Sequence, residues 1–206
     1  ADVIEQAAVW GADALLVHHG YFWKNESPTL IGMKGHRVRA LFENQISLIA
    51  YHLPLDCHPE FGNNKTLLDQ LDLSGGTAIE GERGLLWSVP LNGQFTLPQL
   101  AAEVASRLNR TPLVIESPRA PKSLNRLIVC TGGAQDYLSK AKLYGGDVYL
   151  SGEISERTTH EARELGVHYI SAGHHATERY GVQALGAKVR QEFGIEVAFF
   201  DDHNPA

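Results

Sequence analysis

Cysteine is scarce in this chain of 206 residues, which contains only Cys57 and Cys130. Two cysteines in unrelated contexts do not make a disulfide framework, and they lack the paired spacing of a thiolate metal site. This usage fits a reducing, cytoplasmic setting. The length suffices for one large α/β domain or two small ones, and we expect an ordinary hydrophobic core.

Long apolar runs and long basic runs are also absent from the sequence. No apolar stretch approaches the length of a membrane span, so we expect no membrane insertion. The formal net charge of −6 weighs against non-specific binding to nucleic acid. Residues 131–134 lack the Lys and the Ser/Thr of a P-loop, which favours a simple strand-to-helix turn at that point.

Histidine, by contrast, is abundant, with ten residues of which several are clustered. Residues 14–17 form a short apolar run bounded by Gly11 and Gly20, which is typical of a buried strand in an α/β sheet. His18 and His19 follow this run directly. Because ligands gather beyond the carboxyl ends of such strands, we expect the two histidines at a site. The alternative, for the pair alone, is two ordinary strand-end histidines.

The rest of the sequence alternates between short apolar runs and amphipathic stretches. This pattern predicts an α/β fold with mostly parallel sheets flanked by helices. Within the first helix after the histidines, Val38, Leu41 and Phe42 are core candidates. The predicted strands are 14–17, 46–51, 113–115, 127–130, 148–150, 167–170 and 196–200, and the main predicted helices are 30–44, 97–108, 134–144, 155–165 and 177–193.

Three segments are predicted from this organisation. Residues 1–73 form a first α/β half, residues 74–125 a glycine-punctuated inserted subdomain, and residues 126–206 a second half that packs with the first around the site. The stretch 11–19 aligns with 145–153, and one unit later His-x-x-x-Asp at residues 52–56 aligns with His-x-x-x-Glu at residues 174–178. Duplication and convergence of similar turns both explain this likeness.

The histidines and acids that follow predicted strands form a donor set suited to a transition metal. Imidazole and carboxylate without thiolate favour zinc, manganese, iron or cobalt over calcium or magnesium. His174 and Glu178 are four residues apart at a helix start, so they share one helix face. The strongest candidate ligands are His18, His19, Asp56, His174 and Glu178.

Five donors are too many for one tetrahedral ion with an open position. They fit two divalent ions that share a bridging carboxylate, about 3.5–4 Å apart in sites of this kind. Such a pair lowers the pKa of bound water towards neutrality and supplies a hydroxide nucleophile.

Four motifs carry a resemblance to a known family: V-H-H-G-Y-F-W at residues 17–23, H-L-P-L-D-C-H-P-E at 52–60, S-G-E-I-S-E at 151–156 and A-G-H-H-A-T-E-R at 172–179. They resemble the Nif-three-like family, whose members are often labelled GTP cyclohydrolase 1 type 2 homologues. The resemblance implies a fold of two related α/β halves and a hexameric ring with interior metal sites. It also implies that the front of the family's domain precedes Ala1.

Carried over by motif, the family's two-metal ligands fall on the five residues named above, with Glu178 as the bridge. Further polar residues beside the motifs are candidates for supporting the ligands or for acid/base chemistry, with a purely structural role as the alternative. These are His52, His58, Glu153, His160 and His175.

Three functions remain open on the sequence alone. The first is a metal-dependent hydrolase acting on a nucleotide-like small molecule, for which the family label implies opening of the GTP imidazole ring with release of formate. The second is a non-catalytic metal-binding or metal-delivery protein. The third is a ring-shaped interaction protein that binds DNA or a protein partner, and the negative charge weighs against DNA.

Overall fold

The computed structural model describes residues 1–206 and divides into two compact units. The first unit contains residues 1–55 and 182–204, and the second contains residues 56–181 and 205–206. One boundary lies inside α3 (Leu53–Asp56), directly before Asp56, and another inside α8 (His174–Phe193). The segments 1–73, 74–125 and 126–206, which the sequence pattern predicts, stay a prediction.

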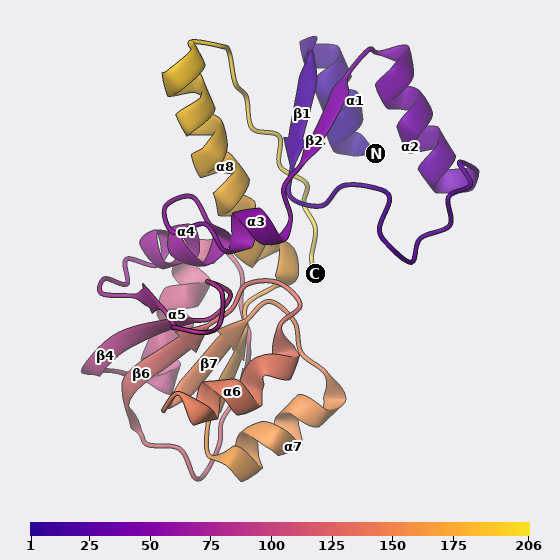
Figure 1. Cartoon of the computed structure of the whole chain (residues 1–206). Coiled ribbons are helices and arrows are strands. Elements are labelled where there is room, and N and C mark those ends of the chain that lie inside the picture. Colours follow the sequence, from indigo (N-terminus) through magenta and orange to yellow (C-terminus); the bar gives the residue numbers. More distant parts are fainter. The chain divides into compact units, whose positions relative to one another are not determined.

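The second unit is built on a six-stranded sheet with the order β3-β4-β6-β7-β8-β5 (Figure 1). Its central pairs, β6–β7 and β7–β8, are parallel, whereas β3–β4, β4–β6 and β5–β8 are antiparallel. In this sheet the prediction of mostly parallel strands therefore holds at the centre and fails at the edges, because strand direction at the edges depends on connections that local patterns do not encode. The strands are β3 (Thr77–Ala78), β4 (Trp87–Thr96), β5 (Leu113–Ile115), β6 (Ser123–Val129), β7 (Val148–Ser151) and β8 (His168–Ser171).

Helices cover both faces of this sheet. Leu127 and Val129 of β6 pack in a core with α4 (Asn63–Gln70) and α5 (Leu97–Leu108), while Ile128 between them packs in a second core. That second core contains residues of α6 (Leu138–Leu143) and α7 (Glu156–Leu165), which lie on one face of the sheet in Figure 1. A short 3-10 helix, η1 (Gln135–Tyr137), precedes α6. The alternation of side chains along a strand thus supplies two separate apolar layers.

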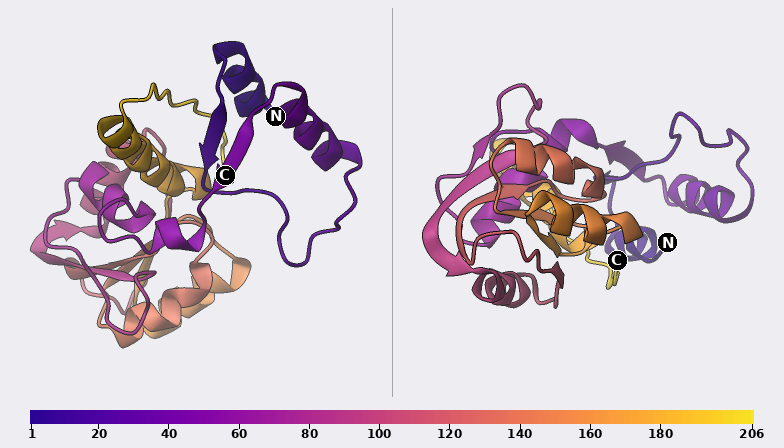
Figure 2. Two further views of the ribbon diagram at one scale, coloured as in Figure 1. Left: turned by 45° about the horizontal axis from the view of Figure 1, so that its top comes forward. Right: turned by 90° about the horizontal axis from the view of Figure 1, so that it is seen from below.

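The first unit is smaller and contains a parallel pair of strands, β1 (Ala14–Val17) and β2 (Ser47–Ala50), which lie side by side in the left panel of Figure 2. Helices α1 (Asp2–Trp10) and α2 (Gly32–Glu43) precede these strands. Gly11 ends α1 at φ 82°, a left-handed conformation that glycine adopts without strain. The small core of this unit is formed by Ile4, Ala7, Leu41 and Ile46.

Several sequence predictions for the first unit are wrong. Strands β1 and β2 are exposed or half-buried along their length rather than buried. Phe42, a predicted core residue, is 78% exposed, although Val38 and Leu41 on the same helix are buried. Residues 196–200 form no strand. Within this segment, the Phe200 side chain packs against the small core and contacts the Trp10 ring edge-on.

Elsewhere the predicted elements agree closely with the structure. Helix α5 and strand β5 have the predicted bounds, and β7 differs by one residue. Helix α8 begins at His174, three residues before the predicted start at residue 177. His174 and Glu178 therefore both belong to the first turns of this helix. No helix of the chain is both long and apolar enough to cross a membrane.

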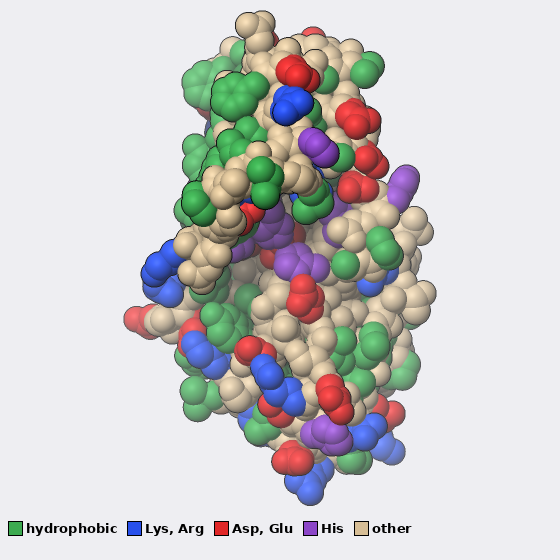
Figure 3. Space-filling view, turned by 90° about the vertical axis from the view of Figure 1, so that its right-hand side faces the viewer, with side chains coloured by type: hydrophobic (Ala, Val, Ile, Leu, Met, Phe, Trp, Pro, Cys, Tyr) green, Lys and Arg blue, Asp and Glu red, His purple; other side chains and the backbone are tan.

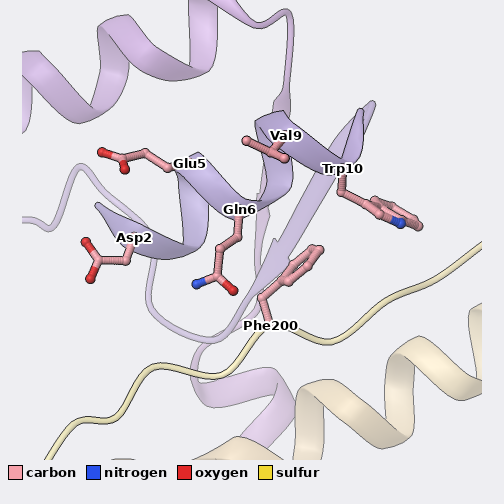
Figure 4. Close-up of a pocket in the computed structure, with 6 residues that line it drawn as sticks. All are labelled: Asp2, Glu5, Gln6, Val9, Trp10 and Phe200. Carbon is pink, nitrogen blue, oxygen red and sulfur yellow. The ribbon is translucent and has the colours of Figure 1, made fainter.

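A groove of about 620 Å³ lies on α1 in the first unit (Figure 4). Its lining combines the apolar side chains of Val9, Trp10 and Phe200 with the polar side chains of Asp2, Glu5 and Gln6. None of the predicted metal ligands lines this groove. The predicted metal ligands lie elsewhere in the chain.

Candidate metal centre

Three imidazoles gather at the ends of the two parallel strands of the first unit. His18 and His19 follow β1, and their ring centroids are 4.6 Å apart. The His52 ring lies 5.0 Å from the His18 ring and 5.2 Å from the His19 ring. One ring nitrogen from each lies within 4.8 Å of the others, so the three form a group that could hold a metal ion. From the sequence, His52 is a candidate for supporting the ligands or for acid/base chemistry and is not among the predicted ligands.

A backbone contact sets the tautomer of His18. Its Nδ1 lies 2.9 Å from the carbonyl oxygen of Tyr51, and a carbonyl oxygen only accepts hydrogen bonds. His18 therefore donates from Nδ1, and Nε2 is the ring nitrogen that would act as a metal ligand. This arrangement is the usual way in which a protein orients a metal-binding imidazole.

Two buried carboxylates and one imidazole are brought together in the second unit. Asp56 is the last residue of α3 and 6% exposed, and Glu178 on α8 is 9% exposed. One oxygen of each carboxylate lies within 4.8 Å of the other. His174, one helical turn before Glu178, places Nε2 2.8 Å from Glu178 Oε2. Burial of two adjacent negative charges is costly without a compensating cation or proton.

His174 is held between two carboxylates. Its Nδ1 lies 2.7 Å from Glu153 Oε1, on the opposite side of the ring from Glu178. The hydrogen bond to Glu178 is the main cause that raises the pKa of His174 to about 9, against a smaller opposing effect of burial. In the metal-free protein this imidazole is thus protonated at neutral pH. A cation bound here would replace that proton.

The turn after β6 provides room for the Glu178 carboxylate. Gly132 has φ 66°, and a Cβ built on it would lie only 1.8 Å from Glu178 Oε1. Thr177, which precedes Glu178, accepts a hydrogen bond from the Gly132 N–H at 3.0 Å. Its hydroxyl in turn donates to the carbonyl of Gly173 at 2.9 Å. The absence of a side chain at Gly132 is therefore what lets Glu178 pack against this turn.

Asn63 supports the other carboxylate. Its Nδ2 donates to Asp56 Oδ1 at 2.8 Å, and its Oδ1 accepts a hydrogen bond from the Gly181 N–H at 3.2 Å. Asn63 is completely buried at the start of α4. One side chain thus connects Asp56 to the α8 backbone, three residues beyond Glu178.

Sequence reasoning missed both Asn63 and Gly132. Gly132 was expected only to form a turn, because nothing local shows that a carboxylate 46 residues later packs on it. Asn63 lies seven residues after Asp56, and the two consecutive asparagines at residues 63 and 64 are the one signal that the sequence offers. Buried amides commonly serve to satisfy other buried polar groups.

The remaining candidates are placed differently. The His58 ring stacks on Phe61, and its Nδ1 accepts the Phe61 N–H at 3.0 Å, which is a structural role in a turn. His160 is exposed on α7. The backbone N–H of His175 donates to the carbonyl of Ala206 at 3.2 Å. Glu153, described above, contacts the predicted ligand His174.

The cysteines do not contribute thiolates. Cys130 lies in the second core, and burial, with a smaller effect from the charges of Asp56 and Glu178, raises its pKa to about 12. Burial also raises the pKa of Cys57. Both side chains are therefore neutral thiols at physiological pH. The donor set consists of imidazole and carboxylate, as the sequence predicts.

These features define an α/β protein with imidazole and carboxylate groups suited to divalent metal ions. The family model for Duf34/NIF3 (NGG1p interacting factor 3) matches residues 1–205, and the chain belongs to this family. This finding confirms the family resemblance of the four sequence motifs.

Relatives and a solved structure support the same assignment. The chain is similar to the "GTP cyclohydrolase 1 type 2 homolog" of Allochromatium vinosum, with 51% identity over all of this chain and 80% of that protein. The relative of the same name in Escherichia coli is 44% identical over 99% of this chain and 81% of that protein. A solved structure described as protein ybgI, of unknown function, matches with a TM-score of 0.91 and 42% identity over 100% of this chain and 81% of that one.

Proposed function

We propose that this protein binds two divalent metal ions and is a metal-dependent hydrolase of a nucleotide-like small molecule. The ligands in this proposal are His18 and His19 of the first unit and Asp56, His174 and Glu178 of the second. Glu178 would be the carboxylate that the two ions share. Zinc, manganese, iron and cobalt all suit this donor set.

One observation carries the proposal: the buried carboxylates of Asp56 and Glu178 have oxygens within 4.8 Å of each other. Two negative charges this close together in a buried environment favour binding of a cation between or beside them. The turn at Gly132 has space for Glu178 only because it lacks a side chain. The donor chemistry and the shape of the site thus agree with a metal centre.

The chain's own residues have separate roles in this centre. Asn63 restrains the Asp56 carboxylate, and Glu153 orients His174 by accepting the proton on Nδ1. The Tyr51 carbonyl does the same for His18. When bound, two divalent ions supply Lewis acidity and activate water towards a polarised bond. Glu153, about half exposed beside His174, is suited to accept or return a proton during turnover.

The relatives' name supports a nucleotide-like substrate, and opening of the GTP imidazole ring with release of formate is the reaction that the name implies. Free thiols at Cys57 and Cys130 fit a cytoplasmic protein. The test is metal analysis of the purified protein, followed by assays of formate release from GTP and of hydrolysis of simple phosphoesters. Each assay is run with the protein stripped of metal and then reloaded with manganese, zinc, iron(II) or cobalt.

Two ligand variants and one control make this test specific. Asp56→Ala and Glu178→Ala should lose bound metal and turnover together. Asp69→Ala removes an exposed carboxylate that pairs with Lys65 on α4, and it should change neither. Turnover that persists unchanged in the metal-free ligand variants would sink the hydrolase proposal.

A non-catalytic role in metal binding or delivery is the second candidate. Its support is that His19 is exposed and His174 only partly buried, which suits ligands that exchange an ion with another carrier. Tight, stoichiometric metal binding without activity on a broad substrate panel would favour this role.

We also propose a homo-oligomer, with a hexamer as the expected size. Hydrophobic side chains gather on part of the surface of the first unit, at the upper left of Figure 3. Exposed apolar residues of this unit include Val9, Phe22, Ile31, Met33 and Phe42. Apolar surface of this kind is commonly buried between subunits. Light scattering on the eluting protein measures the subunit number, and a monomer would contradict the proposal.

A further inference from the structure

Trp23 occupies an unusual place in the loop between β1 and α2. Its indole ring centroid lies 4.9 Å from the His52 ring, at an interplanar angle of 88°, and 6.1 Å from the His19 ring. The side chain is nevertheless 45% exposed. Trp87, by comparison, is 5% exposed and part of a core, with its indole N–H donated to the Gly84 carbonyl. Trp23 is thus not used as a core residue.

A carboxylate holds this loop in shape. Glu26 Oε2 accepts the backbone N–H of Phe22 at 2.8 Å and that of Trp23 at 3.2 Å. The Glu26 N–H donates back to the Trp23 carbonyl at 2.9 Å, which closes a tight turn. The hydrogen bond from Lys34 is the main cause that lowers the pKa of Glu26, so the carboxylate is charged at neutral pH.

Lys34, in the first turn of α2, also stabilises this loop. Its Nζ lies 3.1 Å from Glu26 Oε2, donates to the Ser27 carbonyl at 2.9 Å, and lies 4.7 Å from the centroid of the Phe22 ring. Phe22 has φ 70°, a conformation that residues other than glycine rarely adopt. Such strain persists only where the surroundings impose it, and it concentrates at functional sites. Here the imposed conformation sets the direction in which the next residue, Trp23, leaves the backbone.

We propose that Trp23 is a stacking surface for a planar heteroaromatic ring of the substrate, and that it determines specificity for such a ring. The inference rests on the proposed function, in which the neighbouring histidines hold a reacting metal ion. A half-exposed indole beside an imidazole cluster offers an apolar, polarisable face at the place where a bound ring would meet the metal. Stacking on such a face depends on the ring and not on a phosphate chain attached to it.

The experiment compares two probes that differ in the ring. Binding of GTP and of inorganic tripolyphosphate to the manganese-loaded protein is measured by titration calorimetry. Trp23→Leu should weaken GTP binding by roughly tenfold or more and leave tripolyphosphate binding within roughly twofold. Trp23→Phe, which retains a smaller aromatic face, should lie between the wild type and Trp23→Leu.

Trp10→Leu is the matched control, because Trp10 is also about 40% exposed in the same unit but contacts Phe200 rather than the histidines. It should leave the binding of both probes unchanged. Thermal melting and metal content of each variant show that a loss is not a failure to fold or to hold metal. Equal weakening of both probes in Trp23→Leu, no weakening of GTP binding, or no binding of GTP by the wild type each overturns the inference.

Failure of this inference and failure of the proposed function give different results. Metal-dependent turnover without any Trp23-dependent preference for the ring overturns only the stacking role. Ring binding that depends on Trp23, in a protein that hydrolyses nothing, leaves the stacking role intact and overturns the hydrolase.

Discussion

The amide of Asn63 donates a hydrogen bond to the carboxylate of Asp56, with 2.8 Å between Nδ2 and Oδ1. Both side chains are buried, and the other end of the amide accepts the Gly181 N–H. A side chain that hydrogen-bonds to a metal-binding carboxylate holds it in one orientation and typically contributes a factor of about 10–100 to metal affinity.

Asn63→Ala should therefore weaken metal binding by roughly tenfold or more, measured by titration calorimetry with manganese. Loss of the buried hydrogen bonds should also lower the free energy of unfolding by about 1–3 kcal/mol. Asn64→Ala is the control, since Asn64 is equally buried but bonds to the Leu85 carbonyl and the Thr131 N–H instead. Similar losses of metal affinity in both variants would show that Asn63 acts only through stability.

Gly132→Ala should disrupt the metal centre. The added Cβ would lie 1.8 Å from Glu178 Oε1, so the carboxylate must move, and the left-handed φ adds about 1 kcal/mol of strain. Metal content, measured by elemental analysis after dialysis, should fall towards zero. In Gly133→Ala the Cβ would make ordinary contact with Glu153 at 3.5 Å, and metal should be retained. Full metal occupancy in Gly132→Ala would contradict the assigned role of Glu178.

The metal-free protein should lose stability as the pH rises through the range in which His174 titrates. The pKa of His174 is raised from 6.5 to about 9 in the folded chain, mainly by Glu178. A raised pKa stabilises the fold fully below pH 6.5, and the contribution disappears as the pH rises through about 9. Urea unfolding between pH 6 and pH 10, with a chelator present, should show this fall. His174→Gln should flatten the profile, and a slope equal to that of the wild type would argue against the pairing.

Glu26→Gln should loosen the loop that carries Trp23 while leaving the rest of the protein folded. The amide cannot accept two N–H groups and pair with Lys34 as strongly as a carboxylate does. We expect greater quenching of tryptophan fluorescence by acrylamide and weaker binding of GTP, with metal content unchanged. Asp69→Asn, which breaks the exposed Lys65 pair on α4, provides the comparison and should show neither effect. Unaltered quenching in Glu26→Gln would mean that Glu26 does not hold the loop.

Local patterns in the sequence predict much of the secondary structure. The amphipathic period of α5 predicts its bounds, and its Thr96 and Gln99 form the capping box that starts it. The apolar run of β7 and the glycine after α1 are equally local signals. Phe42 shows where such signals fail, because a helix face is buried only where another element covers it.

How well the sequence predicts a contact within the site depends on how far apart the two residues are in the chain. His174 and Glu178 are one helical turn apart, so their proximity follows from the sequence once the helix is known. The Glu178 carboxylate against Gly132 and the Asn63 amide against Asp56 and Gly181 depend on chain segments that meet only after folding.

The sequence by itself determined the α/β class, the family, and the imidazole and carboxylate chemistry of the candidate ligands. These properties depend on residue types and short-range periodicity, and both can be identified without knowledge of long-range contacts. The tertiary structure decided which carboxylates share a buried place, which backbone turn makes room for Glu178, and that His52 lies with His18 and His19. It also decided how Glu26 and Lys34 hold the loop that carries Trp23, because the hydrogen bonds of an irregular loop do not follow from a periodic sequence pattern.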